Sequence, residues 1–451
     1  AGGVSDGELT FVFGHPARTQ RLYTVDHLRF LRDVHLPQRL RWAWRLEAKL
    51  RAFSGRSPEH ARVARDMLLN IENARKAWTG ELETLMDPGT INSKNREQQR
   101  MIGAMAKRDA ERWPGVSAAV ADVKQSLETY SLFYDREQVI GVRGALFEHA
   151  LHLVRMAQEL AMPSGARLRE YRDSNIEAVE QTLFAETPID ADFEVELIAS
   201  ALGRMAEVLG RDDQIVRTVL RDKTPRERAN EAVRGSGLFD ATLRRRLASS
   251  TPSDLFGRGD PMIDLARSLD PEMRRLRELW EDHVESVQQR AYETIASAWF
   301  EVDGDKVYPE ATFTLRMGFG TVSGYTEPDG TEVAPFTMIG GMFDRSNLWR
   351  GTAPFDMPSK WKNAVGRLNV HTPMNFVYGA DTSGGNSGSP VVNRAGEMVG
   401  VNFDGNVHDL GNNIRYVKQR GRAIAVDTRA IIETMRSVYG AERVVVELAG
   451  E

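Results

Sequence analysis

The pattern of apolar and polar positions divides the chain into three regions. An apolar run over residues 9–13 predicts a short strand, which the glycine and proline that follow it end. From about residue 25 to residue 287, apolar positions recur three or four residues apart, as in amphipathic helices. From about Tyr308 to Glu447, short apolar or alternating runs between glycines and prolines predict strands.

Two helices show the helical pattern most clearly. In residues 64–89 the apolar side chains fall on one face, at Met67, Leu68, Ile71, Ala74, Trp78, Leu82 and Leu85. The Asp87-Pro88-Gly89 sequence should end this helix. A second helix is predicted to end at Gly210, with Asp190 or Asp192 as its N-cap. The charge runs of this region are interpreted as solvated helix faces.

The third region predicts strands within residues 311–325, 373–381, 389–406 and 421–427. The third of these stretches is a hairpin with its turn at Asn393–Gly396, and Asp427 caps a terminal helix that reaches about Val438. A strand, a long helical block and then many strands favour the α+β class, as a β-barrel with an inserted helical domain. The predicted domains are residues 1–24, 25–290 and 291–451.

Composition excludes several classes of protein. Hydrophobic residues make up 41% of the 451 residues and charged residues 27%, which is typical of a globular protein. A net charge of -5 gives no general attraction to nucleic acid, and no apolar run is long enough to span a bilayer. The chain has no cysteine and no H-E-x-x-H motif, so we expect no metal site, and no phosphate-binding loop indicates a cofactor.

The sequence GGNSGSP at 384–390 is the strongest chemical signal. A serine between glycines, placed between two predicted strands, suggests that Ser387 is a nucleophile. The N–H groups of Gly385 and Ser387 could then converge on a developing oxyanion in a loop that also contains Asn386, as in trypsin-like sites. The G-x-S-x-G elbow of α/β-hydrolases is not matched. The alternative is a glycine-rich turn that only precedes a hairpin.

Longer stretches around this motif resemble one family. GGNSGSPVVNRAGEMVGVNFDGN and VFGHPARTQRLYT are similar to serine peptidase family S46, the bacterial dipeptidyl-peptidases of the 7 and 11 types, which release dipeptides from peptide amino termini. The resemblance implies a chymotrypsin-like fold, of which this chain supplies the second barrel, the end of the first barrel and the inserted helical domain. Ala17 stands where the family has glycine, and Val407 where it has tryptophan.

The resemblance also implies roles for residues outside the serine loop. In the F-D-G-N string, Asp404 would bind the free α-amino group of the substrate, and Phe403 would belong to the substrate site. Gly405 would line the pocket for the residue before the cut bond, and a glycine there goes with hydrophobic residues. Asn73, in an N-x-x-K-x-x-x-G pattern with Lys76 and Gly80, would also hold the amino terminus; its alternative is a polar residue on an exposed helix face.

None of the nine histidines has the sequence setting of a catalytic base. They are His15, His27, His35, His60, His149, His152, His283, His371 and His408. The resemblance places the triad histidine and aspartate before residue 1, so we predict that the isolated chain is inactive and the full-length protein is a peptidase. The alternatives are an endopeptidase of the same fold and a non-catalytic peptide-binding fragment. A homodimer and a periplasmic or secreted location are implied by the resemblance alone.

Overall fold

The structure is a computed structural model that describes residues 2–108, 115–307 and 310–449. The chain forms two compact units. The sheet unit comprises residues 1–38, 76–108 and 296–451, and the helical unit comprises residues 39–75 and 109–295. The predicted mixture of helices and sheet is confirmed. Tyr308, the predicted start of the strand-rich region, lies outside the described residues.

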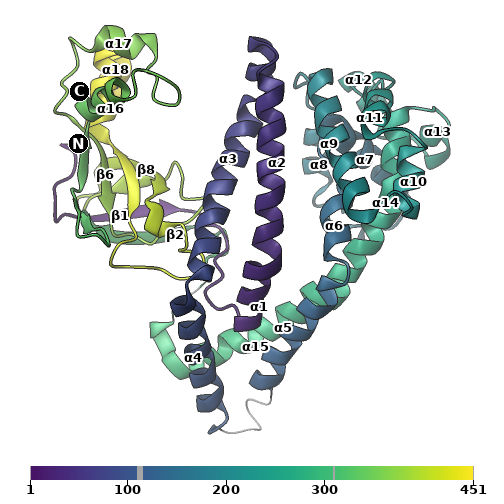
Figure 1. The fold of residues 1–451 in the computed structure, drawn as a ribbon, viewed down its shortest axis with the longest axis horizontal. Helices are drawn as coiled ribbons and strands as arrows, with labels where there is room; N and C mark the ends of the chain where they lie inside the picture. Colours follow the sequence, from purple (N-terminus) through teal and green to yellow (C-terminus); the bar gives the residue numbers. More distant parts are fainter. Residues whose placement is uncertain (1, 109–114, 308–309, 450–451) are drawn as a thin grey trace. The chain divides into compact units, whose positions relative to one another are not determined.

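The sheet unit is built on a seven-stranded antiparallel sheet with the order β2-β1-β7-β8-β9-β6-β5. Its strands are β1 (Leu9–Gly14), β2 (Arg316–Thr321), β5 (Phe336–Met338), β6 (Pro373–Tyr378), β7 (Pro390–Val392), β8 (Met398–Gly405) and β9 (Ala423–Asp427). A separate pair is formed by β3 (Tyr325–Thr326) and β4 (Glu332–Val333). The first strand therefore lies between two strands from the far end of the chain (Figure 1). The strands predicted within residues 311–325, 373–381, 389–406 and 421–427 are confirmed.

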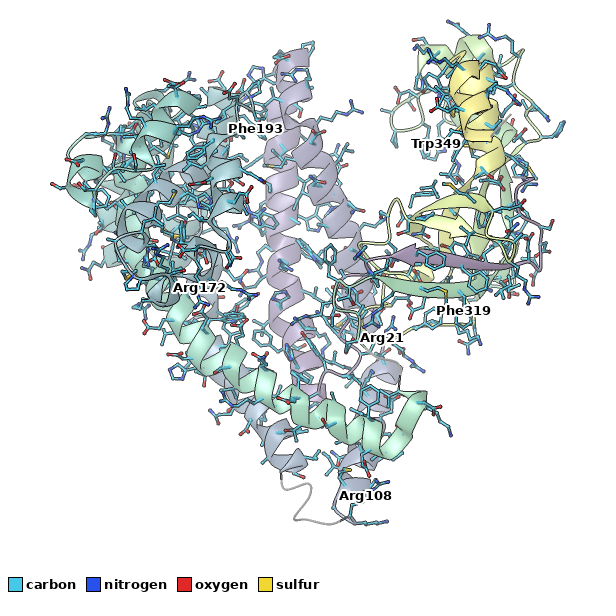
Figure 2. All side chains as sticks on the ribbon, turned by 180° about the vertical axis from the view of Figure 1, so that it is seen from behind. Arg21, Arg108, Arg172, Phe193, Phe319 and Trp349 are labelled. Atoms are coloured by element: carbon cyan, nitrogen blue, oxygen red, sulfur yellow. The ribbon has the colours of Figure 1, made fainter. Side chains whose placement is uncertain are left out.

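Alternation along the strands separates a buried face from an exposed one. Val12 pairs with Val391, and both are buried in a core that also includes Phe376 and Tyr378. On the opposite face, the side chain of Phe319 projects from β2 and is 62% exposed (Figure 2). A period of two residues places successive side chains on opposite faces, which accounts for this division.

Short helices complete the sheet unit. They are α1 (Val25–Phe30), the π-helical turn η1 (Leu31–His35), α4 (Pro88–Met105), α16 (Ile339–Leu348), α17 (Ser359–Ala364), α18 (Thr428–Ser437) and α19 (Glu442–Ala449). Helices α16, α17 and α18 gather at one end of the unit, around Ile339, Leu368 and Ala430 (Figure 1). Asp427 caps α18 by accepting a hydrogen bond from the N–H of Arg429 at 2.8 Å, as predicted.

Three long helices contribute residues to both units: α2 (Leu36–Ser54), α3 (Pro58–Met86) and α15 (Ser286–Asp303). Helix α3 ends where the sequence predicted, but no loop follows it. Asp87 caps α4 at once by accepting from the N–H of Gly89 at 2.9 Å, and Pro88 takes the first helical position. An acidic N-cap followed by proline favours the start of a helix as strongly as it favours the end of the previous one.

The helical unit packs shorter helices around one apolar core. They are α5 (Val116–Ser131), α6 (Tyr134–Ile140), α7 (Ala145–Glu159), α8 (Ile176–Phe184), α9 (Ala191–Leu209), α10 (Gln214–Leu220), α11 (Pro225–Arg234), α12 (Ala241–Leu247), α13 (Pro252–Phe256) and α14 (Pro261–Trp280). Asp190 is the N-cap of α9, and Gly210 ends that helix with a φ of +86°, as predicted. Leu146, Ile198 and Leu265 are among the fully buried core residues.

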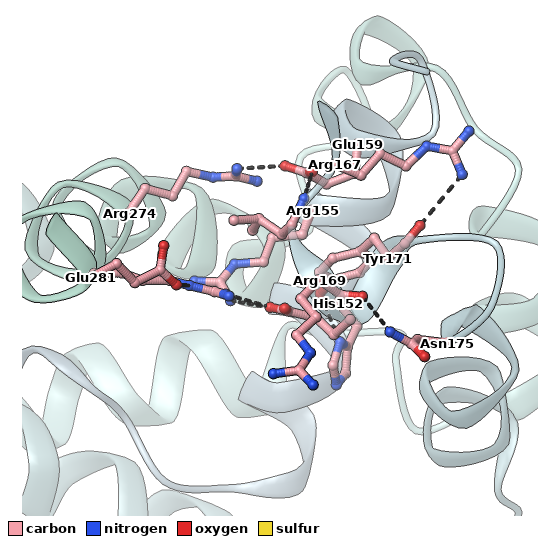
Figure 3. A network of polar contacts seen from close by, with 12 residues as sticks. His152, Arg155, Glu159, Arg167, Arg169, Tyr171, Asn175, Arg274 and Glu281 are labelled. Atoms are coloured by element: carbon pink, nitrogen blue, oxygen red, sulfur yellow. Dashed lines mark hydrogen bonds and ion pairs between the residues drawn. The ribbon is translucent and has the colours of Figure 1, made fainter. Parts of the chain in front are cut away.

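Buried ion pairs tie α7 to α14 within this unit. Glu159 and Asp270 are almost completely buried, and they pair with Arg274 and Arg155 at 2.5 and 2.7 Å (Figure 3). The Tyr171 hydroxyl and His152 Nδ1 form a hydrogen bond of 2.8 Å in the same network. Because a buried carboxylate needs a partner, these arginines fix the pairing of the two helices.

None of the helices in the described part of the chain combines the length and the apolar character that crossing a bilayer requires.

Residues 25–38 and 76–108, which the sequence placed in the inserted domain, belong to the same compact unit as the sheet. The predicted boundaries at residues 24 and 290 remain a proposal for how an inserted domain is delimited.

Candidate active site

The Ser387 loop connects β6 to β7, and its backbone requires glycine. Gly385 and Gly388 have φ angles of +98° and +84°, in the left-handed region that other residues rarely adopt. A Cβ on Gly385 would lie 2.3 Å from the carbonyl oxygen of His15. The turn that follows β1 thus packs directly on the loop, and the N–H of Ala17 donates to Gly384 O at 2.6 Å.

Buried amides hold this loop in place from the inside. Asn386 is 4% exposed, and its side-chain oxygen accepts from the N–H of Ser383 at 3.0 Å. The side-chain nitrogen of Asn402 donates to Asn386 O at 3.3 Å, and the hydroxyl of Tyr378 donates to Asn402 Oδ1 at 2.8 Å. Asn386 therefore points into the protein, where it fixes the shape of the loop.

Ser387 is exposed at the tip of the loop. Its hydroxyl donates to the carbonyl oxygen of Phe403 at 3.2 Å. Within residues 2–108, 115–307 and 310–449, no acceptor takes the N–H of Gly385 or the N–H of Ser387. Two backbone donors beside an exposed hydroxyl can stabilise negative charge that develops on a bound carbonyl oxygen.

No histidine of the described residues hydrogen-bonds to Ser387. His408 Nε2 pairs with Glu327 at 2.8 Å, and His371 is exposed. The ring of His15 lies near that of Phe313, at 6.2 Å between centroids. His27 and His149 are buried, and burial lowers the pKa of these imidazoles to about 3 and about 4. The sequence-based conclusion that none of them is a triad base stays a prediction.

A β-bulge shapes the strand opposite the serine. The pairing of β8 with β9 shifts between Asn402 and Asp404, which leaves Phe403 as an extra, exposed residue. The bulge turns the Phe403 carbonyl toward the Ser387 hydroxyl. Phe403, Asp404 and Gly405, which the sequence assigned to the substrate site, thus lie next to the serine loop.

Asp404 already holds an ammonium group. Lys76 Nζ lies 2.7 Å from Asp404 Oδ2, and the other oxygen accepts from the N–H of Gly405 at 2.9 Å. Helix α3 comes this close because Gly80 has no side chain: a Cβ there would be 2.3 Å from Leu410 Cβ. Of the N-x-x-K-x-x-x-G pattern, Lys76 and Gly80 therefore lie at this site, whereas Asn73 is exposed on α3 in the helical unit.

Sequence reasoning missed a buried charge cluster beneath the loop. Arg21 donates to both carboxylate oxygens of Asp381, at 2.6 and 2.8 Å, and both side chains are about nine-tenths buried. Arg21 Nε also donates to Asn412 O at 2.9 Å, and the side-chain nitrogen of Asn412 donates to the buried carboxyl of Asp409. The only sequence signal was a charged residue at the end of HPARTQR, Arg21, and another at the start of DTSGGNSGS, Asp381. The described residues contain no group of three or more potential metal ligands.

A serine in a glycine-framed loop with two free backbone donors is typical of the nucleophile loop of serine peptidases. The family model of peptidase S46 matches residues 1–450, and the chain therefore belongs to the peptidase S46 family. It is 24% identical over 500 residues to the Asp/Glu-specific dipeptidyl-peptidase of Shewanella putrefaciens, covering 99% of this chain and 65% of the relative. It is 34% identical over 149 residues to dipeptidyl-peptidase 7 of Phocaeicola vulgatus, covering 31% of this chain and 20% of the relative.

Solved structures share the fold. The crystal structure of Porphyromonas endodontalis DPP11 in complex with the dipeptide Arg-Glu has a TM-score of 0.76 and 20% identity, and covers 100% of this chain and 65% of that chain. The complex with the dipeptide Arg-Asp has a TM-score of 0.75. The chain spans 65% of the length of the first of the curated relatives and of these structures.

Proposed function

We propose that the protein is a serine-type dipeptidyl-peptidase, an aminopeptidase that releases dipeptides from peptide amino termini. Ser387 Oγ would attack the carbonyl carbon of the second residue, and the N–H groups of Gly385 and Ser387 would bind the resulting oxyanion. A base takes the hydroxyl proton and passes it to the leaving amine as the C–N bond breaks, and water then hydrolyses the acyl-enzyme. The observation that carries this proposal is the pair of N–H groups without acceptors, next to an exposed hydroxyl, in a loop whose shape needs glycine.

The dipeptide register is proposed to come from Asp404. A carboxylate that binds an ammonium group is a strong charge-assisted partner for a free amino terminus. Lys76 supports this role, because its ammonium group occupies Asp404 Oδ2 in the way a substrate amine would. Phe403 would shape the rim of the same site, and Asn73 is proposed as a second contact of the amino terminus.

The second residue of the substrate would enter beside Gly405. Gly405 has no side chain and so contributes no cation to this wall, and we propose that apolar side chains are accepted and acidic ones are not. The names of the relatives do not decide which second residue this protein prefers, since they include both Asp/Glu-specific enzymes and dipeptidyl-peptidase 7.

The base is proposed to be absent from the isolated chain. The Ser387 hydroxyl donates to a backbone carbonyl, and the described histidines have other surroundings. Without a base, oxyanion donors and binding alone give only about 10³ to 10⁴ over the reaction in water. A chymotrypsin-like barrel, a homodimer and a periplasmic or secreted location belong to the same proposal and rest on the resemblance.

Two measurements test this function. A fluorophosphonate probe should label Ser387 in the protein expressed from its complete gene, and Ser387→Ala should abolish the label. That protein should release dipeptides from a free peptide but not from the same peptide with an acetylated amino terminus. Cleavage of the acetylated peptide would instead identify an endopeptidase, and absence of labelling in a folded protein would favour a peptide-binding protein.

The isolated chain gives a third measurement. Release of dipeptides by these 451 residues alone, abolished by Ser387→Ala, would contradict the proposed absence of the base.

A further inference from the structure

A buried carboxyl group lies directly behind Gly405. A Cβ built on Gly405 would be 2.5 Å from Asp409 Oδ2, and a Cβ built on Gly421 would be 3.1 Å from Asp409 Oδ1. Two glycines, one at the end of β8 and one shortly before β9, thus leave the space that this carboxyl group fills. A side chain at position 405 would begin where the Asp409 carboxyl group now lies.

No cation of the described residues forms an ion pair with this carboxyl group. Its Oδ1 accepts from the side-chain nitrogen of Asn412, and no donor among the residues that the structure describes reaches its Oδ2. The guanidinium of Arg21 is nearby, but two hydrogen bonds commit it to Asp381. Asn412 is 2% exposed, and its side-chain oxygen is also buried without a partner. Arg21 is therefore the nearby cation for both Asp381 and Asp409, and it binds Asp381. Asp409 Oδ2 and Asn412 Oδ1 remain available to accept from a further donor.

The surroundings keep this acid protonated near neutral pH. Burial first, and then the charge of Asp381, raise the pKa of Asp409 to about 8, although Asn412 and Arg21 act in the opposite direction. Asp404 and Tyr378 are the other titratable groups that interact with it. An ammonium or guanidinium group placed against Oδ2 would favour the ionised form and would release the proton.

We propose that Asp409 is a specificity-determining residue for the second residue of the substrate, and that it allows a lysine or arginine side chain beside uncharged ones. This inference rests on the proposed function, because it takes Gly405 as part of that pocket. The Asp409 carboxyl group occupies the space that a side chain of residue 405 would take. The pocket for the second substrate residue is therefore lined by a carboxyl group at this position.

Dipeptides test the inference without a need for the catalytic base. The matched pair is Ala-Lys and Ala-norleucine, which differ by the terminal ammonium group. Calorimetry on the 451-residue chain at pH 7 should give tighter binding of Ala-Lys, by about 10-fold for a hydrogen-bonded charge pair. Binding of Ala-Lys should release a proton, so its enthalpy depends on the ionisation heat of the buffer, whereas that of Ala-norleucine does not.

The variant Asp409→Asn keeps the shape and removes the ionisable carboxyl group. It should reduce the affinity for Ala-Lys to that for Ala-norleucine, abolish the proton release and leave Ala-norleucine binding unchanged. Asp356→Asn, on an exposed loop of the same unit, is the control and should change neither ligand. Equal binding of the two dipeptides to the unaltered chain, or an undiminished preference for Ala-Lys in Asp409→Asn, would overturn the inference.

Failure of the proposed function would look different. If neither dipeptide binds, or if Asp404→Asn leaves both affinities unchanged, the amino-terminal site itself is wrong. If both dipeptides bind and depend on Asp404 but show no preference for lysine, the site is right and the role of Asp409 is wrong. Should Asp409→Asn fail to fold, the proton release of the unaltered chain still decides.

Discussion

Replacing Lys76 with methionine should strengthen the binding of dipeptides. In the structure Lys76 Nζ lies 2.7 Å from Asp404 Oδ2, while Asp404 Oδ1 accepts from the N–H of Gly405. A substrate ammonium group that binds Asp404 must therefore displace Lys76 or share its oxygen. The two side chains are 44% and 40% exposed, and such exposed pairs contribute about 0 to 1 kcal/mol. Lys76→Met should consequently raise the affinity by up to about 5-fold.

Calorimetric titration of Ala-norleucine into the two proteins measures this change. Lys362→Met, which removes an exposed lysine from α17 in the same unit, controls for the loss of one positive charge. Asp404→Asn should weaken binding by about 10-fold or more, because it removes a charge-assisted hydrogen bond. If Lys76→Met weakens binding as much as Asp404→Asn does, Lys76 orients the carboxylate instead of competing for it, and the reasoning is refuted.

Three further substitutions probe the ion pair beneath the Ser387 loop, the loop itself and a buried histidine of α1. Arg21→Met should lower the free energy of unfolding by about 3 to 5 kcal/mol in urea titrations, because it leaves the carboxylate of Asp381 buried without its cation; no change in the midpoint would show that the pair is not formed. Gly385→Ala should abolish fluorophosphonate labelling in the protein expressed from its complete gene, because its φ is +98° and its Cβ would meet the His15 carbonyl, whereas Gly384→Ala, with nothing within 4 Å, should keep the label. His27→Phe should flatten the loss of stability in acid: the pKa of His27 is lowered to about 3 from 6.5 by burial and by His35, so its contribution is complete above pH 6.5 and is lost as the pH falls toward 3. Equal stability profiles of His27→Phe and the unaltered protein between pH 7.5 and about 4 would contradict that assignment.

Local signals predicted the elements of the fold well. The Asp190 cap and the Gly210 terminus of α9 follow from residue types that satisfy or end a helix without help from distant residues. The hairpin of β7 and β8 follows from alternation around a short turn, whose Gly396 has a φ of +79°. Strand order is a non-local property. Nothing between residues 9 and 14 indicates that β1 lies between β2 and β7.

The candidate site likewise has residues that local sequence reveals and residues that only the folded chain reveals. Ser387 and its glycines could be found from the sequence, because the loop carries its backbone requirement in its own residues. The Asp409 carboxyl group could not, since its importance depends on its contact with Gly405 and on the commitment of Arg21 to Asp381. The expectation of a hydrophobic pocket was based on Gly405 alone. The carboxyl group that qualifies it belongs to a residue four positions away, and its contact with Gly405 becomes visible only once the chain is folded.

The Ser387 loop takes its shape from the turn after β1. Ala17 donates to Gly384, the His15 carbonyl packs on Gly385, and Arg21 binds Asp381, so three contacts join segments that the whole helical unit separates in sequence. Closing so long a connection costs little more than closing a shorter one, because each doubling of a flexible loop adds only about 0.6 kcal/mol. An insertion that folds on its own core, as the helical unit does, shortens the effective loop further. The helices between β1 and β2 can therefore vary at small cost to the loop, whereas a change at Arg21 or Gly385 acts on it directly.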